Sequence, residues 1–154
     1  MTRGDKAKEY FNMGYNCAQS VVKAFEDKLG KDIDVYLKIA SSFGGGIGRL
    51  REVCGAFSGS CIVAGILRGY DGENNVDKGN HYKLIQQLAK KNKEKNGSII
   101  CRELLAGTIN LSSENPAERT NEYIKKDLVL NCAILLPIFY PRNLEKYEII
   151  KEFI

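Results

Sequence analysis

The segment 53–67 constrains the fold of this chain more than any other, because it is small or apolar at nearly every position. It has no charged residue, and three glycines, Ser58 and Ser60 interrupt its apolar character. A bilayer-crossing helix needs about 18 or more consecutive apolar residues, so the segment is more typical of a buried helix. Glycine inside a helix costs about 1 kcal/mol relative to alanine. Gly55 and Gly59, one helical turn apart, therefore predict close backbone approach by neighbouring helices.

Apolar residues recur at helical spacing along most of the remaining chain. Asn16 is a good N-cap, with Gln19 as its capping-box partner, and Gly30 supplies a left-handed stop. No segment alternates as a half-buried strand would. We therefore predict an all-α fold, a compact bundle of about six to eight helices with a glycine-rich loop before the central helix. The expected helices cover residues 7–14, 16–29, 34–42, 53–67, 76–95, 98–105, 116–135 and 142–154.

Length and charge narrow the class of protein further. A chain of 154 residues and 17.2 kDa is long enough for one core, so residues 1–154 are predicted to form a single helical domain. The net charge of +4 is spread along the chain, which does not favour nucleic acid as a partner. The first residues are charged where a secretory signal would be apolar. We expect a cytoplasmic protein without membrane insertion.

Five cysteines in a reducing compartment are not expected to form structural disulfides. Cys17, Cys54, Cys101 and Cys132 each fall on the inward face of a different predicted helix, and none belongs to a C-x-x-C motif. If the four thiols meet, they form a sulfur cage suited to an iron–sulfur cluster or zinc. The alternative is four separate core cysteines. Cys61 lies two turns beyond Cys54 and is interpreted as a packing residue.

Two of these cysteines occupy helix starts. Free N–H groups and the helix dipole stabilise a thiolate there, so Cys17 and Cys54 are the candidate nucleophiles. The glycine loop at 43–48 ends just before Cys54, and its N–H groups are candidate donors to sulfur or to an anion, with Arg49 and Arg51 adding positive charge. The alternative for this loop is a flexible connection. The lysine-rich end of the 76–95 helix is interpreted as a solvated face.

Three motifs resemble a known family. They lie at 14–20 (Gly-Tyr-Asn-Cys-Ala-Gln-Ser), 43–49 (Phe-Gly-Gly-Gly-Ile-Gly-Arg) and 52–59 (Glu-Val-Cys-Gly-Ala-Phe-Ser-Gly). The chain is similar to the redox-active family named for its C…CGAxxG…C…C pattern, over about residues 1–136. The match places the four cysteines on the pattern and leaves Cys61 outside it. A related domain in some multi-domain cytochromes holds an iron–sulfur cluster, whereas this chain lacks the C-x-x-C-H needed for covalent haem.

The resemblance implies redox activity. The leading hypothesis is a cluster of the two-iron type, used for electron transfer or sensing, bound by the four cysteines and flanked by Gly45, Gly46 and Gly55. One alternative is a metal-free thiol–disulfide protein in which Cys17 or Cys54 attacks. Another is a helical binding module with structural zinc or no site. We further expect a redox partner that the sequence does not identify, and a homo-oligomer is compatible with the glycine-rich helix.

Overall fold

The computed structural model describes residues 1–116 and 118–136, and these residues are mainly helical. The all-α prediction is confirmed, because the only β pairing in the described part of the chain is an isolated antiparallel bridge between Val53 and Ile100. The helix expected at 142–154 lies outside the described residues. The helices are α1 (Arg3–Asn12), α2 (Cys17–Lys23), α3 (Glu26–Leu29), a 3-10 turn (Gly30–Asp32), α4 (Ile33–Ser41), α5 (Gly55–Arg68), α6 (Asn75–Asn96), α7 (Cys101–Leu105), α8 (Asn121–Lys125) and α9 (Leu128–Leu135).

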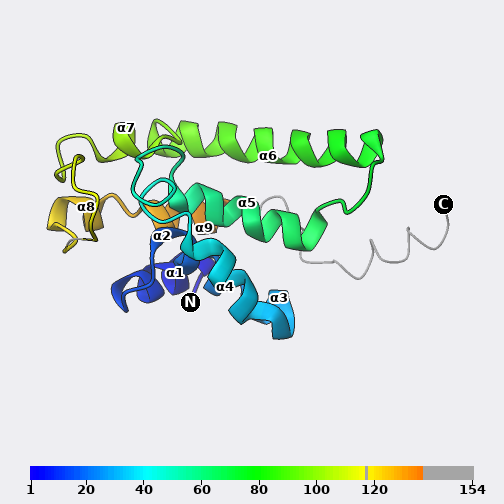
Figure 1. Ribbon diagram of the computed structural model, residues 1–154, viewed down its shortest axis with the longest axis horizontal. Coiled ribbons are helices and arrows are strands. Elements are labelled where there is room, and N and C mark those ends of the chain that lie inside the picture. The colour runs from blue at the N-terminus through cyan, green and yellow to red at the C-terminus, as the bar shows by residue number, and fades with distance from the viewer. Residues whose placement is uncertain (117, 137–154) are drawn as a thin grey trace.

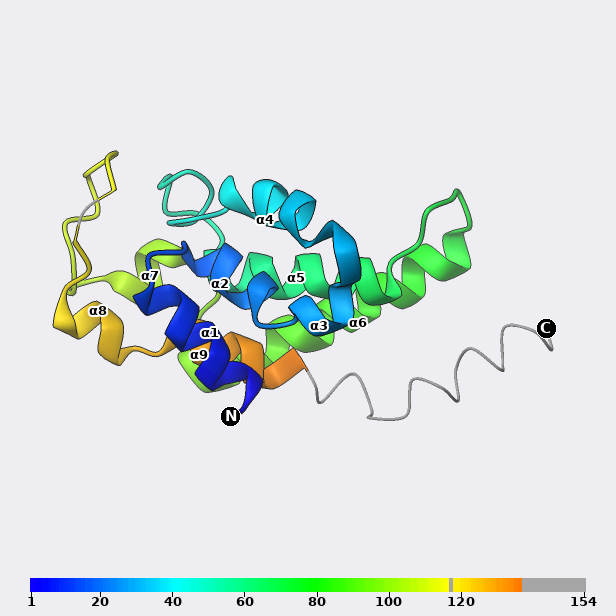
Figure 2. The same cartoon turned by 90° about the horizontal axis from the view of Figure 1, so that it is seen from below.

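Helix α5 is the central element, as the 53–67 segment predicted. It packs against α2, α3, α4, α6 and α9, and the two views show these helices around it (Figures 1 and 2). A Cβ atom at Gly59 would lie 2.6 Å from the carbonyl oxygen of Ala18 in α2. The two backbones therefore touch at a position where only glycine fits.

The predicted helix 16–29 starts as expected but is interrupted. Asn16 caps α2 by accepting from the Gln19 backbone N–H, and the Gln19 side chain accepts from Asn16 in return. The α2 helix ends at Lys23, where Arg3 donates to the Ala24 carbonyl oxygen at 2.7 Å. The guanidinium of Arg3 also lies over the ring of Phe25, 4.9 Å from its centroid. A side chain from α1 thus bonds to the carbonyl group that would accept from a backbone N–H in a continuous helix.

The predicted helix 116–135 is wrong as a single element. It is divided into α8 and α9 by Asp127, whose backbone is left-handed with φ 49°. Aspartate is among the few residues that tolerate this conformation. The break reorients the chain so that α9 packs on α1, α2, α5 and α6. Within the described residues, no helix has the combination of length and apolar character that crossing a membrane requires.

Candidate functional site

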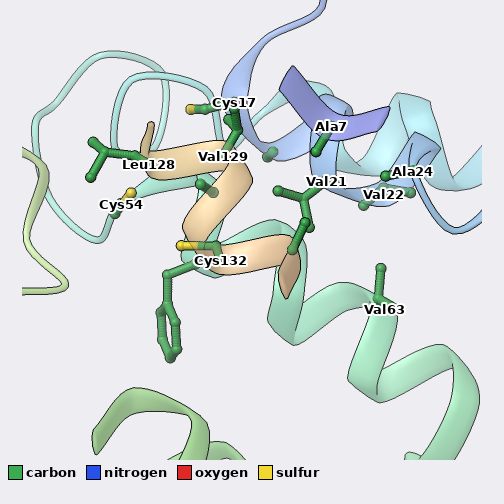
Figure 3. Packing of buried hydrophobic residues seen from close by; sticks show 14 of the residues in the cluster. Ala7, Cys17, Val21, Val22, Ala24, Cys54, Val63, Leu128, Val129 and Cys132 are labelled. Atoms are coloured by element: carbon green, nitrogen blue, oxygen red, sulfur yellow. The ribbon is translucent and has the colours of Figure 1, made fainter. Parts of the chain in front are cut away.

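The four cysteines of the sequence pattern come from four elements, and three of them lie within electrostatic range of Cys54. Cys17 is the first residue of α2, Cys54 caps the start of α5, Cys101 opens α7, and Cys132 lies in α9; all four are buried. Cys17, Cys54 and Cys132 are seen gathered around α9 in Figure 3. The Cys54 thiolate interacts electrostatically with each of the other three thiols. We call these four residues the cysteine cluster.

A short backbone pairing holds Cys54 beside Cys101. The Cys54 N–H donates to the Ile99 carbonyl at 2.8 Å, and the Cys101 N–H donates to the Glu52 carbonyl at 2.6 Å. These bonds flank the Val53–Ile100 bridge. Two cysteines that are far apart in sequence therefore start adjacent helices at one point of the fold.

Cys54 is the most acidic thiol of the cluster. A hydrogen bond from the Cys132 thiol lowers the pKa of Cys54 to about 7, and the N–H groups of Phe57 and Ala56 at the start of α5 act in the same direction, against the opposing effect of burial. The same bond, together with burial, raises the pKa of Cys132 well above its ordinary value. Cys54 therefore ionises first, while Cys132 keeps its proton.

Cys132 has a second hydrogen-bond acceptor within reach. Its Sγ lies 2.9 Å from Oδ1 of Asn92 in α6, whose own side-chain amide donates to the Leu88 carbonyl at 3.1 Å. A thiol has one proton, so Asn92 and the Cys54 sulfur compete for it. Asn92 is 1% exposed, whereas the lysines around it are exposed, so the interpretation of this helix end as a solvated face is confirmed for the lysines and wrong for Asn92. Its spacing of four from Leu88 is the sequence signal for a buried position.

Cys17 does not behave as a stabilised thiolate. Burial raises the pKa of Cys17 to about 12, with repulsion from Cys54 and Cys101 adding to it, although the Gly45 N–H bonds to its sulfur and opposes the shift. At Cys17 burial outweighs the backbone N–H groups that bond to the sulfur, whereas the pKa of Cys54 is lowered. The roles of both thiols as nucleophiles stay predictions. A Cβ at Gly55 would lie 2.3 Å from the Cys17 Sγ, so this glycine makes room for the sulfur.

A buried arginine faces Cys101. Arg51 Nη1 lies 3.8 Å from the Cys101 Sγ. Burial raises the pKa of Cys101, and the hydrogen bond from Arg51 partly offsets that increase. A Cβ at Gly46 would lie 2.7 Å from the Cys101 Cβ, which places this glycine against the cluster as well. The three glycines expected beside the site, Gly45, Gly46 and Gly55, all lie against Cys17 or Cys101.

The glycine loop before α5 has a defined conformation. Its backbone is left-handed at Gly45, Gly46, Ile47, Gly48, Arg49 and Arg51. Several of its N–H groups are used within the loop: that of Arg51 donates to the Gly45 carbonyl at 3.2 Å, and that of Glu52 to the Gly46 carbonyl at 3.0 Å. Left-handed backbone at non-glycine residues costs about 1–3 kcal/mol each, and such strain clusters at functional sites. The loop is therefore more ordered than a flexible connection would be.

The arrangement of the thiols is not that of a preformed single-metal site. Within residues 1–116 and 118–136, no group of three or more His, Cys, Asp or Glu side chains is placed to hold one metal ion. All five cysteines are free thiols. Cys61 is half-buried in α5, where burial raises its pKa to about 12. The structure thus brings the cluster residues close together without placing them as ligands of one ion.

Two further residues beside the cluster were not identified from the sequence. Tyr123 is half-buried, and burial, together with the charges of Cys17, Cys54 and Cys101, raises the pKa of its hydroxyl. Arg119 lies over the ring of Phe11, 3.5 Å from its centroid. Both belong to the region that the sequence predicted to be one continuous helix. That prediction did not place them beside the cysteine cluster.

A family model described as "putative redox-active protein (C_GCAxxG_C_C)" matches residues 15–137. The match includes all four residues of the cysteine cluster. The family name has the order Gly-Cys-Ala, whereas this chain has Cys54-Gly55-Ala56. No curated protein and no solved structure matches the chain. Because the family model spans most of the chain, the protein belongs to the C_GCAxxG_C_C family of redox-active proteins.

Proposed function

We propose that the cysteine cluster binds an iron–sulfur cluster of the two-iron type and that the protein acts in electron transfer or redox sensing. The observation that carries this proposal is the central position of Cys54, which interacts with Cys17, Cys101 and Cys132 from three other elements. Four thiolates are the usual ligand set of such a cluster. A bound cluster supplies one-electron transfer.

The groups around the sulfurs suit thiolate ligands that carry negative charge. The Gly45 N–H donates to Cys17, the Ala56 and Phe57 N–H groups donate to Cys54, and Arg51 donates to Cys101. Hydrogen bonds to sulfur stabilise the reduced, more negative state of a thiolate-bound centre and raise its reduction potential. Because the thiols are not placed for one metal ion, the proposal requires their side chains to turn toward the cofactor.

A metal-free thiol–disulfide function is the second candidate, and the Cys54–Cys132 hydrogen bond favours it. In this reaction the Cys54 thiolate attacks a disulfide of a partner and releases one partner thiolate. Cys132 passes its proton to the released partner thiolate and then attacks the Cys54 sulfur of the mixed disulfide, which releases the second partner thiolate. The partner disulfide is reduced by two electrons, and Cys54 and Cys132 are oxidised to a disulfide. Either function is compatible with a cytoplasmic protein and requires a redox partner. We also propose that the chain forms a homo-oligomer.

The two candidates are separated by anaerobic purification followed by visible absorption and by iron, zinc and acid-labile sulfide analysis. A cluster gives colour, with iron and sulfide in equal amounts and little zinc. Serine substitution of Cys17, Cys54, Cys101 or Cys132 should then remove the iron, whereas Cys61→Ser should retain it.

A colourless protein without iron, in which oxidation reversibly consumes only the Cys54 and Cys132 thiols, would replace the cluster proposal by the thiol–disulfide function. Zinc without colour would assign a structural metal. Equal loss of iron in the Cys61→Ser and Cys101→Ser variants would show that Cys61 is wrongly excluded from the set of ligands.

A further inference from the structure

An open cleft of about 640 Å³ lies beside the cysteine cluster, where the glycine loop faces the start of α2 and residues 109–116 and 118–123. Cys17 is the cluster residue that lines it, together with Arg49, Arg51 and Arg119. Small-molecule sites usually measure about 300–1,000 Å³, so the cleft has room for a ligand.

Arg51 is the residue that points to the chemistry of this ligand. Its side chain is buried, with 6% of the residue exposed. Nη1 faces Cys101, but Nε and Nη2 are buried without a hydrogen-bond partner among the described residues. A buried cation whose donors are unpaired is strongly unfavourable unless an anion completes it. The part of the chain that the structure describes offers no carboxylate in an ion pair with Arg51.

The other two arginines of the cleft also lack an ion pair within the described ranges. Arg49 Nε donates to the Ser113 carbonyl at 3.1 Å, and Arg119 Nη2 donates to the Tyr15 carbonyl at 2.7 Å. These neutral acceptors orient the guanidinium groups and leave their charge uncompensated. Glu114 and Glu118 also line the cleft, but both are exposed and neither is bonded to these arginines.

We infer that the cleft binds a small oxyanionic molecule, bearing phosphate or carboxylate groups, whose negative charge balances the guanidinium groups of Arg51, Arg49 and Arg119. A guanidinium presents parallel donors that match the oxygens of either group. Arg49 and Arg51 both belong to the loop that borders the cleft, and both have a left-handed backbone (φ 65° and 61°). The inference goes beyond the redox function and does not rest on it.

Titration calorimetry on the purified chain of 154 residues tests the inference, with pyrophosphate as the phosphate probe and malonate as the carboxylate probe. We expect at least one probe to bind at low salt and to bind more weakly as chloride rises. Arg51→Met and Arg49→Met should each weaken binding by about tenfold or more, the loss typical of one charge-assisted hydrogen bond. Arg102→Met is the matched control, because Arg102 is an exposed arginine that pairs with Glu52 outside the cleft.

The experiment distinguishes a phosphorylated ligand from a carboxylic acid, and it tests anion binding separately from the redox function. Binding of pyrophosphate alone assigns a phosphorylated ligand, and binding of malonate alone assigns a carboxylic acid. Cys54→Ser should bind the probe as the unchanged chain does, even if it loses a metal centre. Circular dichroism identifies any variant that fails to fold, and Arg49→Met remains informative if Arg51→Met does so. The inference is overturned if neither probe binds the intact chain, or if folded arginine variants bind as tightly as the Arg102 control.

Discussion

The Sγ of Cys132 lies 2.9 Å from Oδ1 of Asn92, and both residues are almost completely buried. This contact connects α9 to α6. The Asn92 oxygen and the Cys54 sulfur therefore compete for the one proton of the Cys132 thiol. The acidity of Cys54 therefore depends on a residue that belongs to no motif of the sequence.

Asn92→Leu should make Cys54 more acidic. Without the amide oxygen, the Cys132 proton has the Cys54 sulfur as its remaining acceptor, and donation to a thiolate lowers its pKa. The midpoint of Cys54 alkylation by iodoacetamide, followed by mass spectrometry of the metal-free chain, should shift to lower pH. Asn96→Leu, which removes the Asn96 amide that donates to Asn92 at 3.4 Å, is the control and should leave the midpoint closer to that of the unchanged chain. An unchanged midpoint in Asn92→Leu would show that the proton already lies toward Cys54.

Alkylation should also rank the thiols of the metal-free chain. Cys54 has a pKa of about 7, whereas burial raises those of Cys17 and Cys61 to about 12. At pH 7.5 a small alkylating reagent should modify Cys54 first, because the thiolate is the reactive form. Faster labelling of Cys17, which lines the open cleft, would show that access rather than ionisation controls the rate.

The reduced, metal-free protein should lose stability at alkaline pH. In the unfolded chain the Cys17 and Cys61 thiols ionise near pH 9, but in the folded chain their raised pKa values keep them protonated to about pH 12. Above pH 9 the folded state thus binds more protons, and its free energy of unfolding falls with rising pH. Each thiol contributes about 1.4 kcal/mol per pH unit between its two pKa values, as an order of magnitude.

Urea unfolding at pH 8, 9 and 10 with a phosphine reductant measures this loss. Cys61→Ala should reduce the slope by the share of one thiol, since the raised pKa values of Cys17, Cys101 and Cys132 remain. The lowered pKa of Cys54 acts in the opposite direction, because its contribution is present above the unfolded pKa and is lost as pH falls through 7. A stability profile that is flat from pH 8 to pH 10 would contradict the raised values.

Gly55→Ala should disturb the packing of the cysteine cluster and also lower the free energy of unfolding. The new Cβ would lie 2.3 Å from the Cys17 Sγ and 2.5 Å from the Phe43 carbonyl oxygen, and the backbone at Phe43 cannot yield as a flexible side chain would. Overpacking of this kind costs about 1–3 kcal/mol or more. Chemical denaturation measures the loss, and the amount of bound iron measures the damage to the site.

Gly65→Ala is the matched control in the same helix. A Cβ at Gly65 meets no atom within 4 Å, so alanine there should raise the free energy of unfolding by up to about 1 kcal/mol through its higher helix propensity. Similar destabilisation by both substitutions would show that α5 requires glycine for a reason other than contact.

Local chemistry in the sequence was sufficient to predict the all-α class, the cap at Asn16, the central helix and the glycine contacts at Gly55 and Gly59. These features depend on neighbours within a few residues, or on an uncharged and mostly apolar segment that is stable only in the interior of the fold. The breaks at Phe25 and Asp127 were not predictable in this way. The first depends on Arg3 reaching the Ala24 carbonyl from another helix, and the second on how α9 packs on α1.

The sequence by itself identified the four cysteines and the loop glycines beside them, because motif spacing is a property of the chain. Only the tertiary structure decided how the four thiols differ. Cys54 is acidic because it receives a hydrogen bond from Cys132 and lies at the start of α5, whereas Cys17 is not, because burial outweighs the backbone N–H groups that bond to its sulfur. Asn92 and the orphaned donors of Arg51 became significant only after distant segments were packed together. The pKa of a thiol depends on burial and on charges from the whole fold, and neither quantity is encoded at one position of the sequence.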